Sequence, residues 1–164
     1  MSKEPLFFWN GPFSNWYPSK FKDEDGTLYF NNEQYMMRQK AILFNDKENE
    51  YNIMNTTLPK EIKMYGRKVK NFDKEKWNQY ARDIVTHGCY LKFSQNPKLK
   101  AILLSTNKKK IVEASQYDNI WGIGLNEKQA RRLPEDKWPG KNWLGECLMR
   151  TREILIDKQT KRIP

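Results

Sequence analysis

Apolar residues at helical spacing dominate this chain. They recur every three or four positions, so they fall on one face of a helix. The predicted helices run from Glu33 to about Phe44, from Pro59 toward Tyr65, from Trp77 to Cys89, from Pro97 to Leu104 and from Gly145 to about Asp157. Asn31 or Asn32 is expected to cap the first helix, and Gly66 is expected to end the second.

Strand signals are few and short. Leu6–Trp9 and Ile111–Ala114 are short apolar runs, and the turn residues Asp23–Gly26 predict a hairpin that leads into Thr27–Phe30. The chain shows no internal repeat, and Lys158–Pro164 has the composition of a tail. The pattern therefore predicts a mainly α fold, α+β with a small antiparallel sheet.

The composition narrows the class of protein. A chain of 164 residues favours one domain over residues 1–164, with a core at about 6–156. Aromatic residues make up 13%, which disfavours a disordered chain because such residues bury enough surface to offset chain entropy. No apolar run approaches the roughly 20 residues that span a bilayer, and the first residues lack the pattern of a signal peptide. Membrane and secreted classes are disfavoured.

The two cysteines, Cys89 and Cys147, stand far apart and form no CxxC pair. This usage predicts an intracellular, cytoplasmic protein (nuclear if the source is eukaryotic or viral) with two buried thiols rather than a disulfide framework. The single histidine, His87, with two cysteines falls short of a zinc set, and no nucleophile motif accompanies it for a catalytic triad. We expect no metal and no cofactor.

The net charge of +10 comes from 30 Lys and Arg against 20 Asp and Glu. Positive potential attracts polyanions and phosphate-bearing ligands. A lysine-rich surface that only keeps the protein soluble explains the same charge equally well.

Glu33 and Lys40 form the first candidate pair. They stand seven positions apart, two turns of the predicted helix, so both can point the same way from a face that also carries Met36, Met37 and Phe44. Charges there are costly to bury unless they are paired or used, and an amine in such a place can act as a nucleophile while the carboxylate moves protons. The alternative is that both side chains simply extend to solvent.

The segment from Glu113 to Gly124 is the second candidate. Glycines allow the backbone to approach a phosphate or ribose closely, and Trp121 offers a flat face to a base. Trp-Gly-Ile-Gly is not the GxGxxG fingerprint, which disfavours dinucleotide dehydrogenase chemistry. A glycine turn held by one buried tryptophan is the structural alternative.

The third candidate, Trp138–Gly145, leads into the last helix. A helix N-terminus there can present N–H groups to an anion, although a plain turn and cap explains the same residues. The loop Phe13–Pro18, which contains Asn15 and Trp16, resembles the rim of a ligand site.

These pieces together resemble the NADAR (YbiA-like) family of N-glycosidases over roughly residues 6–156. The resemblance is carried in order by Phe13–Pro18, Glu33–Tyr35 with Lys40-Ala41, Gly66-Arg67, Lys92-Phe93, Leu103–Thr106, Val112–Ser115, Asp118 with Trp121–Gly124, and Asn142–Gly145. The family usually has Phe at the position of Trp16 and a smaller apolar residue at that of Trp143, which leaves the shape of the substrate open.

The resemblance implies an enzyme that cleaves the bond between ribose C1 and a nitrogen, without metal. Lys40 would attack the anomeric carbon and hold the opened sugar as a Schiff base, with Glu33 as its proton-transfer partner. Glu113 and Asp118 would bind ribose hydroxyls or protonate the leaving base. The residues expected to bind substrate are Asn15, Trp16, Arg67, Trp121, Gly122, Gly124, Asn142, Trp143 and Gly145, with Arg67 facing phosphate.

Three functions follow from this sequence. The preferred one is hydrolysis of ADP-ribosylated guanine in a nucleotide or nucleic acid, with no membrane and no obligate protein partner. A second is an N-glycosidase acting on phosphoribosylamino-pyrimidine intermediates of riboflavin synthesis. A third is a catalytically silent module that binds ADP-ribose or single-stranded nucleic acid.

Overall fold

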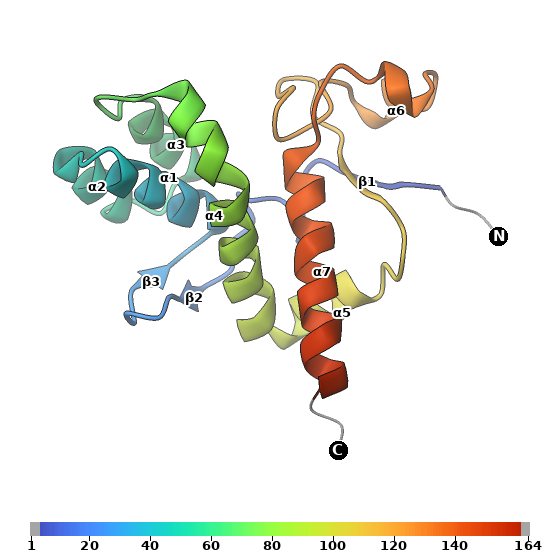
Figure 1. The fold of residues 1–164 in the computed structure, drawn as a ribbon, viewed down its shortest axis with the longest axis horizontal. Helices are drawn as coiled ribbons and strands as arrows, with labels where there is room; N and C mark the ends of the chain where they lie inside the picture. The colour runs from blue at the N-terminus through green and yellow to red at the C-terminus, as the bar shows by residue number, and fades with distance from the viewer. Residues whose placement is uncertain (1–3, 162–164) are drawn as a thin grey trace. The chain divides into compact units, whose positions relative to one another are not determined.

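Helices make up most of the computed structural model, which describes residues 4–161 (Figure 1). The elements in chain order are β1 Leu6–Phe8, β2 Phe21–Lys22, β3 Leu28–Tyr29, α1 Asn32–Leu43, α2 Lys47–Met54, α3 Pro59–Arg67, α4 Lys74–Gln95, α5 Pro97–Leu104, β4 Ile111–Glu113, α6 Glu127–Ala130, the 3-10 turn η1 Glu135–Lys137 and α7 Trp143–Lys161. The predicted mainly α class is confirmed. None of these helices combines the length and apolar character needed to cross a membrane.

The described residues divide into two compact units. The terminal unit combines residues 4–14 with 97–161, and the central unit spans Asn15–Asn96. That the chain forms one domain stays a prediction.

The central unit is built on α1, which packs against α2, α3 and α4, as Figure 1 shows. Asn31 caps α1 as predicted, because its side chain accepts a hydrogen bond from the Gln34 N–H. The predicted hairpin is also confirmed: β2 and β3 pair antiparallel, with Phe21 opposite Tyr29.

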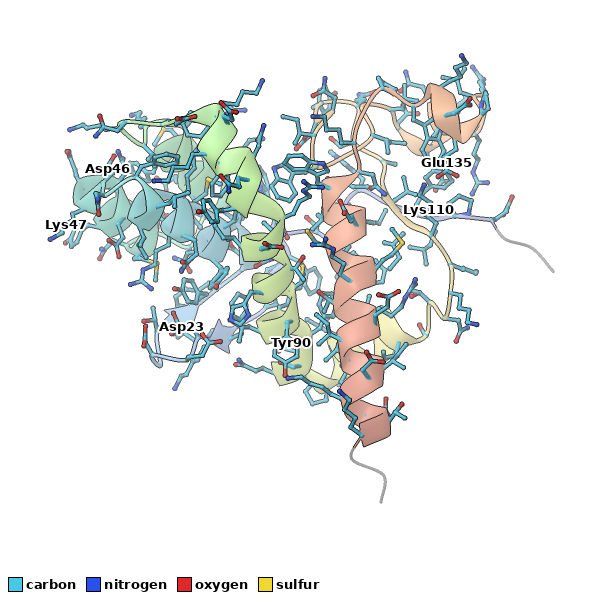
Figure 2. All side chains as sticks on the ribbon, in the orientation of Figure 1. Asp23, Asp46, Lys47, Tyr90, Lys110 and Glu135 are labelled. Carbon is cyan, nitrogen blue, oxygen red and sulfur yellow. The ribbon has the colours of Figure 1, made fainter. Side chains whose placement is uncertain are left out.

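Asp23, labelled in Figure 2, ties this hairpin to the helices. Its Oδ1 accepts from the Thr27 N–H at 3.0 Å inside the turn, and its Oδ2 accepts from the Tyr29 hydroxyl at 3.0 Å. The Arg38 guanidinium of α1 donates to the same hydroxyl at 2.6 Å and pairs with Glu50 of α2 at 3.1 Å. This network orients α1, the helix that carries the candidate amine.

In the central unit one expectation is wrong and one helix was missed. Gly66 does not end its helix, since α3 continues to Arg67; a Cβ at Gly66 would overlap the Met37 sulfur, so the glycine permits close packing on α1. Helix α2 was not predicted, because Ile53 is its only buried apolar residue and no apolar stripe marks it. Its start is set by Asp46, which accepts from the Asn49 N–H at 3.1 Å.

In the terminal unit, β1 and β4 pair in parallel, with Phe7 opposite Val112. The described residues therefore form two separate two-stranded sheets, and this one is parallel, whereas the sequence predicted one small antiparallel sheet. A parallel pair needs a long connection, and about a hundred residues separate these strands, so no local turn signal announces the pairing. Lys110, just before β4, forms an ion pair with Glu135 (Figure 2).

Helix α7 packs against β4 and α5. It continues to Lys161, so Lys158–Lys161 are helical rather than part of a tail. The rest of the predicted tail, 162–164, lies outside the described residues.

Candidate functional site

The first turn of α1 buries a carboxylate. Glu33 is only 6% exposed, and its backbone N–H donates to the Asn15 carbonyl at 3.0 Å, which anchors the Asn15–Trp16 loop to the start of the helix. Two turns later, Lys40 is half-buried on the same helix. Helix α1 therefore holds a carboxylate and an amine at a fixed separation along one rigid element.

Two neighbouring charges, those of Glu33 and Arg67, influence the pKa of the Lys40 amine. Burial lowers the pKa of Lys40 below its usual value, the Glu33 carboxylate acts to raise it, and the exposed Arg67 guanidinium acts to lower it further. The structure thus brings Glu33, Lys40 and Arg67 together within the central unit. A lowered pKa increases the fraction of uncharged amine, which is the form that can attack carbon.

Aromatic rings form part of the surroundings of this amine. The Lys40 Nζ lies 4.4 Å from the centroid of the Phe72 ring and 5.8 Å from that of Trp77. Ring faces stabilise an ammonium and so work against the effect of burial. Burial outweighs this effect, because the pKa of Lys40 is lowered overall.

A buried amide cluster supports the predicted rim residue Asn15. The Asn32 Nδ2 donates to the Asn15 Oδ1 at 2.9 Å and lies 3.4 Å from the Cys89 sulfur. A Cβ at Gly88 would overlap the Asn32 side chain, so this glycine makes room for the cluster. Asn15 is 7% exposed, whereas Trp16 is 44% exposed and has the Lys63 Nζ 5.9 Å from its ring centroid. Of these two rim residues, only Trp16 presents a broad open surface.

Lys92 is a second unusual amine, to which the sequence assigned no role. It is 1% exposed, one turn after Cys89 on α4, and its Nζ lies 4.9 Å from the Phe93 ring centroid and 5.9 Å from that of Tyr17. Burial lowers the pKa of Lys92 to about 8. Its position in the Lys92-Phe93 pair was the only sequence signal, because lysine in a helix is normally exposed.

Asp118 organises the second candidate loop, in the terminal unit. Its Oδ1 accepts from the N–H groups of Ile120 and Trp121, both at 2.9 Å, and its carbonyl accepts from the Gly124 N–H at 3.1 Å. Gly124 has φ +75°, which side chains rarely adopt. A Cβ at Gly122 would lie 2.9 Å from the Asp118 carbonyl oxygen and 3.1 Å from that of Glu113, so Gly122 brings the loop close to the end of β4.

The carbonyl groups of this loop cap the start of α7. The N–H groups of Asn142, Trp143 and Leu144 donate to the carbonyls of Gly122, Ile120 and Trp121, each at 3.1 Å. These three N–H groups are therefore not available to an anion, and of the two interpretations of this segment the turn and cap is the one observed.

Asn142 holds β4 in place from the start of α7. Its Oδ1 accepts from the Glu113 N–H at 2.9 Å and its Nδ2 donates to the Ile111 carbonyl at 3.0 Å. A Cβ at Gly145 would overlap the Ile111 carbonyl and the Asn142 side chain. These two predicted substrate-binding residues thus have a structural role that the sequence did not reveal: they position the backbone of Glu113.

Trp143 is buried, at 8% exposed, instead of standing at a rim. Its ring meets that of the half-buried Trp121 edge to face, with centroids 5.6 Å apart. Within the terminal unit the structure therefore gathers Glu113, Asp118, Trp121, Gly122, Gly124, Asn142, Trp143 and Gly145 around the end of β4.

Metal-ligating side chains are scattered. Across residues 4–161, no three His, Cys, Asp or Glu side chains gather as a metal site requires. The His87 Nε2 lies 2.6 Å from the Glu24 Oε1 at an exposed position. Cys89 and Cys147 are both unbridged and buried, as predicted.

Comparison with known proteins gives a consistent result. The NADAR domain family matches residues 7–156. The N-glycosidase R617 of Acanthamoeba polyphaga mimivirus is 50% identical over 145 residues, covering 86% of this chain and 85% of that protein. The N-glycosidase YbiA of Escherichia coli is 31% identical over 147 residues, covering 88% and 81%.

A solved structure agrees. The NMR structure of the E. coli protein YbiA matches with a TM-score of 0.81 and 26% identity, over all of this chain and 92% of that one. The chain therefore belongs to the NADAR family and is an enzyme of the N-glycosidase class.

Proposed function

We propose that this N-glycosidase hydrolyses the bond between ribose C1 and the guanine nitrogen of ADP-ribosylated guanine. The observation that carries the proposal is the arrangement on α1, where the half-buried Lys40 amine follows the buried Glu33 carboxylate by two turns. Burial lowers the pKa of this amine, and the Glu33 carboxylate acts to raise it. The net charge of +10 supports a phosphate-rich substrate over a small metabolite.

The chemistry needs a nucleophile, a base and an acid. In the proposed reaction the uncharged Lys40 amine attacks ribose C1, the C1–N bond to guanine breaks, and Glu33 accepts the proton that the attacking amine loses. The departing guanine nitrogen takes a proton from an acid, for which Glu113 and Asp118 are the sequence-based candidates. The sugar ring then opens to a Schiff base on Lys40, and water hydrolyses it to release ADP-ribose and the free amine.

The remaining predicted residues have assignable roles. Arg67 is exposed and close enough to influence the pKa of Lys40, which suits a guanidinium that meets a phosphate of the same substrate. The open face of Trp16 suits a planar ring. Gly122 and Gly124 shape the loop that follows β4, so their contribution is the backbone path they allow.

Two lysines in the central unit, Lys40 and Lys92, have a lowered pKa. We choose the nucleophile between them by the exposure of the amine and by the presence of a group that can accept its proton. Lys92 has the pKa nearer to neutrality, but it is 1% exposed. Lys40 is half-buried and has a carboxylate within electrostatic reach to accept its proton. We therefore assign the attack to Lys40.

The direct test is hydrolysis of ADP-ribosylated guanosine monophosphate and of the same lesion in single-stranded DNA, followed by release of ADP-ribose. We expect the parent to release ADP-ribose from these substrates and to leave a phosphoribosylamino-pyrimidine intact. Lys40→Ala should lower kcat by a factor of at least about a thousand while substrate binding stays measurable.

Lys47→Ala is the matched control, because Lys47 is an exposed lysine at the start of α2 in the same unit (Figure 2). It should keep the parent rate. Turnover of the pyrimidine in preference to the guanine adduct would replace the proposed substrate, and a parent rate in Lys40→Ala would remove Lys40 from the mechanism.

A further inference from the structure

The terminal unit contains a pocket of about 470 Å³ that the proposed chemistry does not use. It opens beside β1 and the segment after β4, and four of its lining residues are aromatic: Phe7, Phe8, Trp9 and Tyr117. Ala114, which directly follows Glu113, lines it as well. Its volume falls in the range of small-molecule sites.

Two of these aromatic side chains are unusually open. Trp9 is 60% exposed and Tyr117 is 81% exposed. Each exposes a large apolar ring face to water, at a cost that burial against another ring would remove. Because every nucleobase has a π-face, exposed rings at a pocket form a stacking platform for one.

Amide side chains supply the polar part of the lining. Asn10, Gln116 and Asn126 lie in it, and two of them are joined to Tyr117 in a chain of hydrogen bonds: Asn126 Nδ2 donates to Gln116 Oε1 at 3.3 Å, and Gln116 Nε2 donates to the Tyr117 hydroxyl at 2.8 Å. Amides both donate and accept, as the edges of a base require. The chain also limits the directions that the Tyr117 ring can take.

The distribution of charge in and around the pocket favours a base over a phosphate as its occupant. Glu127 is the one charged side chain in the pocket lining formed by the described residues, so an anion would be repelled inside it. Cations stand next to it: Lys128 on α6 and Arg131 just after α6 are both exposed. The Arg131 guanidinium lies 5.0 Å from the Phe7 ring centroid and pairs with Glu127 and Glu4, each at 3.4 Å. A base inside with its phosphates outside matches this distribution.

We propose that this pocket binds an unpaired base of single-stranded nucleic acid, stacked on Trp9 and Tyr117 and hydrogen-bonded by the amides. The inference rests on the proposed function and sharpens it, because it makes a nucleic-acid strand, rather than a free nucleotide, the preferred carrier of the ADP-ribosylated guanine.

The test measures binding of a fluorescent single-stranded oligonucleotide of about ten thymidines, free of ADP-ribose, by anisotropy. Stacking contributes about 1–3 kcal/mol per base, so Trp9→Ala with Tyr117→Ala should weaken binding by about tenfold or more. Tyr51→Ala, which removes a ring 69% exposed on α2 of the other unit, should leave the affinity unchanged. If the double variant does not fold, each single variant should bind the oligonucleotide about threefold more weakly than the parent.

Hydrolysis adds an independent arm. The double variant should keep kcat/KM on ADP-ribosylated guanosine monophosphate and lose it on the same lesion in single-stranded DNA. Equal oligonucleotide affinity in parent and double variant, an equal loss in Tyr51→Ala, or equal binding of a duplex would overturn the inference. A parent that binds the oligonucleotide through these rings but releases no ADP-ribose would refute the proposed function alone.

Discussion

At the scale of single residues, the proposed mechanism depends on how α1 holds the Lys40 amine. Lysine is normally a solvated cation that cannot attack carbon. In this protein burial lowers the pKa of Lys40. The Glu33 carboxylate favours the charged ammonium and acts to raise that pKa, whereas the Arg67 guanidinium disfavours the ammonium and acts to lower it. The three side chains therefore set the fraction of reactive amine at a given pH.

This electrostatic arrangement predicts the pH dependence of the reaction. The rate should rise with pH as the Lys40 ammonium loses its proton, and this limb should lie below the usual pKa of 10.5. Arg67→Met removes a repulsive charge, which raises the pKa of Lys40, so the limb should move to higher pH. The measurement is kcat against pH with saturating substrate.

Arg132→Met is the control for that prediction, because Arg132 is an exposed arginine of the other unit. Its profile should overlay that of the parent. A limb that moves to lower pH in Arg67→Met, or one that moves equally in both variants, would contradict the account of Lys40.

Lys92 predicts an effect on stability. Its pKa is about 8 in the folded protein and near 10.5 when unfolded, so between these values the unfolded chain binds more protons and folding stability rises with pH. Lys92→Met removes the cost of burying the charge, so below pH 8 it should raise the free energy of unfolding by up to about 3 kcal/mol. The gain should shrink toward zero near pH 10.5.

Denaturant unfolding of parent and Lys92→Met at pH 7 and pH 10 measures this difference. Lys98→Met, at an exposed position, should change the free energy of unfolding little at either pH. A constant difference between parent and Lys92→Met across that range would show that the Lys92 amine does not titrate as the structure indicates.

Residue spacing predicted part of the arrangement of the candidate site and missed the rest. Glu33 and Lys40 could be paired because helical spacing fixes relative direction. The burial of Lys92 could not be predicted, because it depends on what packs around α4 and not on α4 itself. Asn142 was predicted to bind substrate, yet its side chain hydrogen-bonds the backbone of β4, a contact between residues about thirty positions apart.

At the scale of elements, the close approach of α7 to β4 positions Glu113. Asn142 bonds the backbone on both sides of Val112, and Gly145 allows the helix to reach the strand. Gly145→Ala places a methyl group against the Ile111 carbonyl and the Asn142 side chain, so it should lower the free energy of unfolding by about 1–3 kcal/mol. Chemical denaturation measures the loss.

Asp157→Ala serves as the control on the same helix, since Asp157 is exposed; its effect should stay within about 0.5 kcal/mol. An unchanged unfolding curve for Gly145→Ala would mean that α7 can move away from β4 without cost.

The elements themselves were largely predictable. Five of the helices, the hairpin and both strand segments carry local signals of spacing, caps and turns. Helix α2 was missed because only Ile53 of its apolar residues is buried, and the parallel pairing of β1 with β4 was missed because no local signal links strands so distant in the chain.

At the scale of the whole molecule, net charge is the property that bears on the substrate. A charge of +10 predicts that binding of a polyanion releases counterions, so the KM for ADP-ribosylated single-stranded DNA should rise steeply with salt. The KM for ADP-ribosylated guanosine monophosphate should rise less, because it carries fewer phosphates. Steady-state kinetics at several sodium chloride concentrations give, for each substrate, the slope of log KM against the logarithm of the salt concentration. Equal slopes for the two substrates would mean that the positive charge serves solubility alone.

The central claim is that Lys40 forms the covalent intermediate. Incubation of the parent with ADP-ribosylated guanine DNA and sodium borohydride, followed by proteolysis and mass spectrometry, should place a reduced ribose adduct on the peptide that contains Lys40 and leave Lys92 unmodified. An adduct on Lys92, or turnover with no trapped lysine, would contradict the account.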